Sequence, residues 1–70
     1  MNININFDGI PDAVRQAINK ANMSEAEFAD KTGVSQSVIN RIVRRATIQI
    51  KLETFSRLWP FIGEYLIILP

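Results

Sequence analysis

Apolar residues recur every three or four positions in four stretches of the chain, which is the period of a helix with one buried face. The first stretch runs from Pro11 to about Ala21 and places Val14 and Ile18 on the same side as Ala21. Pro11 suits the first turn of a helix, because the N–H that it lacks would have no partner there. We therefore predict a helix over residues 11–21.

The second and third stretches predict two short helices joined by a tight turn at Gly33. Ser24 and Glu27 have the spacing of a capping box, in which each side chain satisfies a backbone donor of the first helical turn. Phe28 and Ala29 then form the apolar face of this helix. Glycine accepts the left-handed backbone conformation with which many helices end, so we expect the chain to change direction at Gly33.

Ser35 restarts the chain as the expected N-cap of the next helix. Ile39 and Ile42, three residues apart, form its buried stripe. The opposite, exposed side carries hydrogen-bonding and basic side chains, namely Gln36, Ser37, Asn40, Arg41 and Arg44. The predicted helix-turn-helix covers residues 24–44.

A fourth helix is predicted from about Lys51 onward, after a segment, 46–51, that has no helical period. Its apolar positions repeat at three and four residues and are Leu52, Phe55, Leu58 and Trp59. Pro60 lacks the backbone donor and clashes with the preceding turn, so we expect this helix to end or kink near Leu58 to Trp59.

Both ends of the chain have the pattern of strands. Ile3, Ile5 and Phe7 alternate with three asparagines, as in a strand with one buried face, and Tyr65 to Leu69 is a run of strand-favouring residues. An antiparallel pair of these strands would tie the two ends of the domain together. The expected fold class is therefore mostly α with a small β part: four helices with short N- and C-terminal β-strands.

The central segment resembles the helix-turn-helix of the phage repressor and Cro proteins, an XRE-like family. The likeness covers roughly residues 10–60, and its recognition helix is most similar to that of lambda Cro. It is carried by Ala29, Gly33, Val34, Ile39 and Ile42 together with the run Gln36-Ser37-Val38-Ile39-Asn40-Arg41. The resemblance implies a lambda-repressor-like domain that binds double-stranded DNA through its second helix.

Composition limits the other classes of function. The chain has 70 residues, no cysteine and no histidine, so disulfides and thiolate metal sites are excluded, and its acids have no metal-ligand spacing. We expect one domain over 1–70, no metal, no cofactor, no small-molecule substrate and no enzymatic activity, because no nucleophile–base pair or phosphate-binding glycine loop is present. The sequence shows neither a secretory signal nor a span of about 20 apolar residues, so we expect a cytoplasmic protein without a membrane partner.

The net charge of +1 is unevenly distributed. Residues 1–30 hold two cations and five acids, a net charge of −3, whereas residues 31–57 hold six cations and one acid, a net charge of +5. Clustered cations on a small domain are often only a solvated charged face. Because these begin at the predicted turn and continue through the recognition helix, we expect them to meet DNA phosphates.

The exposed face of the recognition helix supplies the candidate site. Gln36 can bond to the edge of adenine, Arg41 can bond to the edge of guanine, Asn40 can contact adenine or a phosphate, and Ser37 can contact either base or backbone. The candidate phosphate contacts are Ser35, Lys31, Arg44 and Arg45. The competing interpretations are a solvated helix end for Gln36 and Ser37 and an internal ion pair for Arg41. Where repressor-type relatives commonly have glutamine, this chain has Glu25, whose carboxylate would repel a phosphate.

We therefore expect a sequence-specific transcriptional regulator, a Cro-like repressor of phage or prophage type that binds a two-fold operator. At this size oligomerisation often helps stability, and we expect a homodimer that forms through the terminal β-strands. The alternative is an antitoxin-like or antirepressor-like protein-binding module with the segment YLIIL as its interface.

Overall fold

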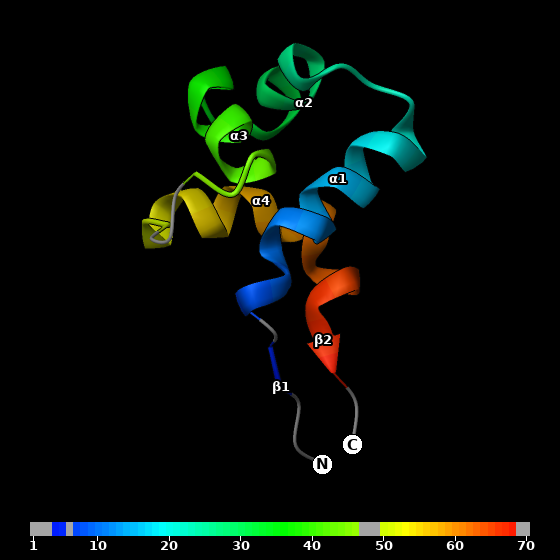
Figure 1. Ribbon diagram of the computed structural model, residues 1–70, viewed down its shortest axis with the longest axis vertical. Coiled ribbons are helices and arrows are strands. Elements are labelled where there is room, and N and C mark those ends of the chain that lie inside the picture. The colour runs from blue at the N-terminus through cyan, green and yellow to red at the C-terminus, as the bar shows by residue number, and fades with distance from the viewer. Residues whose placement is uncertain (1–3, 6, 47–49, 69–70) are drawn as a thin grey trace.

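The computed structural model describes residues 4–5, 7–46 and 50–68. Four α-helices make up most of this part of the chain (Figure 1). In chain order the elements are β1 (Asn4–Ile5), the 3-10 helix η1 (Phe7–Gly9), α1 (Ile10–Ala21), α2 (Glu25–Thr32), α3 (Gln36–Val43), α4 (Leu52–Leu66) and β2 (Ile67–Ile68). The pair α2 and α3 lies at one end of the molecule, and β1 and β2 lie side by side at the other (Figure 1).

The predicted ends of α2 and the start of α3 are confirmed. Ser24 Oγ accepts from the Glu27 backbone N–H at 3.1 Å and Glu27 Oε1 accepts from the Ser24 N–H at 3.1 Å, which completes the capping box. Gly33 ends α2 in the left-handed conformation, with φ +75°. Ser35 then caps α3, where its Oγ accepts from the Val38 N–H at 3.4 Å.

The core forms where α1 packs against α3 and α4 and where α2 packs against α3. Its fully enclosed side chains come from all four helices and include Val14, Phe28, Ile39, Ile42, Leu58, Ile62 and Leu66. Phe28 also meets Phe61 of α4 edge to face, with ring centroids 5.8 Å apart. The two helices of the helix-turn-helix are therefore held on a platform made by α1 and α4.

Helix α4 is longer than the sequence predicts, because it continues through Pro60 to Leu66. An interior proline costs a helix about 3 kcal/mol. Beyond Pro60, however, the helix buries Ile62 and Leu66 completely, and full burial of such a side chain contributes about 1.5–3 kcal/mol each. Because Pro60 has no N–H, the Ser56 carbonyl has no hydrogen-bond donor within the helix. Ser56 lies on the exposed side of α4, where water can donate to this carbonyl.

The apolar stripe of α4 is also shifted relative to the prediction. Leu52, the first position of the predicted apolar repeat, is 79% exposed at the first turn of the helix. Phe55 and Trp59 are half-buried and stack at a tilt with centroids 5.5 Å apart, whereas Leu58 is fully buried. The buried face of α4 therefore begins at Leu58 and continues at four-residue spacing through Ile62 and Leu66.

The predicted terminal strands are not supported at the length expected from the sequence. Tyr65 and Leu66 belong to α4 instead of a strand, and Phe7 begins the 3-10 helix. Among the described residues, two pairs form an antiparallel ladder, Asn4 with Ile68 and Ile5 with Ile67. The remaining predicted strand positions at 2–3, 6 and 69 lie outside the described residues. The domain is therefore essentially a four-helix unit.

Within the described ranges, none of the helices has the length and apolar character needed to cross a membrane.

Candidate nucleic-acid interface

Helix α3 is buried on one side and open on the other, as the sequence predicts. Ile39 and Ile42 are buried in the core, at 0% and 1% exposure. Gln36, Ser37 and Arg41 are exposed. Because the inner stripe packs against the other helices, the outer side chains stand on a rigid support and share one face of the helix.

The turn before α3 is held by side-chain contacts that the sequence does not predict. Thr32 is buried, and its Oγ1 donates to the Phe28 carbonyl at 2.9 Å while it accepts from the Val34 N–H at 3.3 Å. Arg57 of α4 donates to the Gly33 carbonyl at 2.8 Å. From the sequence, Arg57 is only one of the cations of the basic segment 31–57. In the structure it ties the turn to α4.

Asn40 lies differently from the sequence prediction, which placed it in the exposed row. Its side chain is half-buried and faces α2. Asn40 Nδ2 donates to Glu25 Oε1 at 3.1 Å, and Glu25 is itself half-buried. Glu25, at the position where repressor-type relatives commonly have glutamine, thus contacts α3 directly.

The remaining predicted contacts lie around the two ends of α3. Lys31 is exposed at the last turn of α2, and Ser35 and Ser37 lie at the start of α3 with their hydroxyls 3.4 Å apart. Arg41 Nε donates to the Ser37 carbonyl at 3.5 Å, and Arg44 is the exposed C-cap of the helix. No ion pair within the described ranges involves Lys31, Arg41 or Arg44. Within these ranges, no carboxylate of the protein therefore neutralises their charges.

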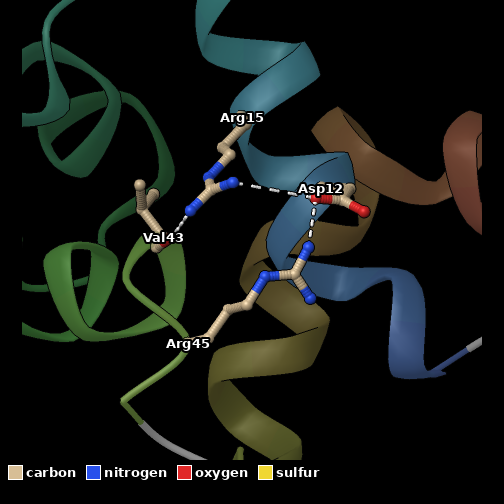
Figure 2. Close-up of polar contacts among 4 residues, drawn as sticks. All are labelled: Asp12, Arg15, Val43 and Arg45. Atoms are coloured by element: carbon tan, nitrogen blue, oxygen red, sulfur yellow. Dashed lines mark hydrogen bonds and ion pairs between the residues drawn. The ribbon is translucent and has the colours of Figure 1, made fainter.

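Arg45 is an exception among the predicted phosphate contacts, because it is paired within the protein. Its Nη2 lies 2.6 Å from Asp12 Oδ1, and Arg15 Nη1 lies 3.9 Å from the same oxygen (Figure 2). Arg15 also donates through Nη2 to the Val43 carbonyl at the end of α3. Figure 2 shows both guanidinium groups directed at one carboxylate, which joins the first turn of α1 to the exit of α3.

The exit of α3 has the hydrogen bonds of a Schellman motif without the usual glycine. The Ala46 N–H donates to the Arg41 carbonyl at 2.8 Å, and the Arg45 N–H donates to the Ile42 carbonyl at 3.0 Å. Arg45 occupies the left-handed position, with φ +59°. This conformation costs a non-glycine residue about 1–2 kcal/mol, and the contact with Asp12 offsets part of that cost.

The Asp12 contact leads to a prediction for Asp12→Asn. Loss of an exposed ion pair should change the free energy of unfolding by less than about 1 kcal/mol. Affinity for duplex DNA should rise by about threefold or more at low salt, because one repelling charge is lost and Arg45 becomes available to phosphate. Fluorescence anisotropy with a labelled duplex measures the change. Asp8→Asn, at an exposed acid, is the charge-matched control, and an equal gain in both variants would contradict a specific role for Asp12.

The fold and this surface define a helix-turn-helix domain: a short supporting helix, a glycine turn and a second helix with an exposed polar and basic face. Residues 14–58 match a family model described as helix-turn-helix, and the chain belongs to this XRE-type helix-turn-helix family. Neither a comparison with curated proteins nor one with solved structures gave a match. Membership of the family implies a transcription regulator that binds double-stranded DNA.

Proposed function

We propose that the protein is a sequence-specific, Cro-like repressor of phage or prophage type that inserts α3 into the major groove of an operator. The observation that supports this most strongly is the exposed row of Gln36, Ser37 and Arg41 on a helix whose opposite side is buried. Each of these side chains offers hydrogen-bonding groups suited to base edges or to the DNA backbone. The role is one of binding, without catalysis or a cofactor.

The side chains divide into two roles under this proposal. Gln36 bonds to the N6 and N7 edge of adenine, and the guanidinium fork of Arg41 bonds to the O6 and N7 acceptors of guanine. Lys31, Arg44 and, when released from Asp12, Arg45 contact phosphates. Ser37 serves base or backbone, and Ser35 adds a backbone contact beside its capping bond. Phosphate contacts set the position of the helix, and base contacts set the sequence preference.

We further propose that two copies bind a two-fold operator together. A 70-residue domain gains stability from oligomerisation more readily than a large one. The ladder of β1 and β2 has no third strand in the described part of the chain, and its outer edges are the natural place for strands of a second copy. An operator with two related half-sites follows from such symmetry.

One observation counts against the alternative of a protein-binding module. That hypothesis assigned the interface to an exposed YLIIL segment, yet Leu66 is fully buried and Tyr65 is half-buried at the end of α4. Ile67 is 37% exposed, but Tyr65 and Leu66 pack on their own domain, so the repressor is the better-supported function.

Titration against random duplexes at two salt concentrations tests the DNA-binding function. Each phosphate contact lowers the logarithm of affinity by about 0.9 for a tenfold rise in salt. With at least two such contacts, a plot of log affinity against log salt should have a slope of about −2 or steeper. Absence of binding even at low salt would reject the function. Selection of bound sequences from a random pool then tests the two-fold operator, because a dimer should select two inverted half-sites, whereas a single unsymmetrical site would contradict the dimer.

A further inference from the structure

We propose that Glu25 is a specificity-determining positioning residue, which holds the amide of Asn40 in one of its two orientations. The inference rests on the DNA-binding function proposed above and deepens it. Glu25 is the first residue of α2, and Asn40 lies in the middle of α3. Both side chains are half-buried, and Asn40 Nδ2 lies 3.1 Å from Glu25 Oε1.

The chemistry of the two groups makes this contact directional. An ionised carboxylate only accepts hydrogen bonds, whereas the amide of Asn40 has a donating and an accepting end. Rotation of the amide by half a turn would place its oxygen against Glu25 Oε1, so that two acceptors repel each other. Glu25 therefore keeps the amide nitrogen of Asn40 towards α2 and directs the amide oxygen elsewhere.

A single amide orientation affects the way in which Asn40 can recognise a base. Bidentate contact with adenine needs the amide oxygen and an amide N–H in a set arrangement, and an amide free to rotate offers the reversed arrangement as well. A side chain already held in place also loses less conformational entropy on binding. Glu25 thus sharpens the preference of Asn40 for one base pair without touching the base itself.

The same carboxylate lowers affinity for all sequences. In the described part of the chain no ion pair involves Glu25, so its negative charge is not neutralised by a neighbouring cation. A negative charge beside α3 repels the phosphates of any duplex. Retaining a carboxylate here therefore weakens general binding and strengthens discrimination between bases.

Glu25→Gln separates these effects, with Glu27→Gln as its matched control. Glutamine at position 25 can donate or accept, so it permits both orientations of Asn40 while it removes the charge. Glu27 lies in the same helical turn, and glutamine at its position also completes a capping box. Both variants lose one negative charge from the first turn of α2, but only the first changes the partner of Asn40.

Selection from a random DNA pool and titration of the full chain with random duplex measure the two effects. Random-duplex affinity should rise by a similar, few-fold factor in both variants. Glu25→Gln should relax discrimination at one position of each half-site by about tenfold, and Glu27→Gln should retain the parent preference. In an Asn40→Ala background, Glu25→Gln should leave the base preference unchanged.

The outcomes separate this inference from the proposed function. If the parent protein selects a sequence but Glu25→Gln selects it as sharply as Glu27→Gln, the positioning role is wrong and the DNA-binding function stands. If the parent binds no duplex, both fail. The side-chain amide signals of Asn40 in NMR spectra of the free protein give a check without DNA. They should move in Glu25→Gln and stay in place in Glu27→Gln, and unmoved signals in both would overturn the contact.

Discussion

Leu58→Ala should destabilise the domain by about 2–5 kcal/mol, the range for truncation of an enclosed leucine. Leu58 is 0% exposed and lies in α4, at the start of the stripe that continues to Ile62 and Leu66. A small domain has a total stability of only about 5–15 kcal/mol, and a chain of this size is expected near the lower limit. Urea denaturation followed by circular dichroism should show a clearly lower midpoint with an unchanged slope.

Leu52→Ala is the matched control, since it makes the same change in the same helix. Leu52 is 79% exposed, and exposed substitutions usually change stability by less than about 0.5 kcal/mol. A large loss for Leu52→Ala together with a small loss for Leu58→Ala would mean that α4 buries a different face. The pair of variants therefore tests the shift of the apolar stripe.

Gln36→Ala and Arg41→Ala should each relax the preference at a single base position by roughly 1–3 kcal/mol. Both side chains are exposed, so the free energy of unfolding should be nearly unchanged. Competition binding with operator variants, each carrying one altered base pair, measures the loss. The altered position should differ between the two variants, because the side chains lie more than one helical turn apart on α3.

Arg44→Ala is the contrasting variant, because Arg44 is the C-cap of α3 and is assigned to phosphate. It should weaken binding to all sequences similarly and reduce the steepness of the salt dependence by about one for each copy bound. Loss of sequence preference in Arg44→Ala, or uniform weakening in Gln36→Ala, would reverse the division between base and phosphate contacts.

Local signals were sufficient to predict the helix-turn-helix itself. Serine caps and a glycine end act within a few residues of the chain, and the structure has them at Ser24, Gly33 and Ser35. The end of α4 depended on distant contacts instead. Pro60 is a strong local signal to stop, but burial of Ile62 and Leu66 against the other helices outweighs it.

The candidate site shows the same division between local and distant determinants. The period of α3 correctly placed Gln36, Ser37 and Arg41 on its exposed side. Asn40 fell on the same side by spacing, but its side chain turns to Glu25, which is 15 positions away in the chain. The period of apolar residues predicts which face of a helix is exposed. It does not predict the partner of a side chain at the edge of that face.

Two arginines outside the helix-turn-helix donate hydrogen bonds to backbone carbonyls at the two ends of α3. Arg57 bonds to the carbonyl of Gly33 just before α3, and Arg15 bonds to the carbonyl of Val43 at its last residue. Carbonyl groups are the same in every amino acid, so neither attachment depends on which side chains α3 exposes. Side chains on the exposed face of α3 can therefore be replaced without removing either of these two main-chain contacts. We therefore expect variants with altered side chains on the exposed face of α3 to keep this helix in the same position on α1 and α4.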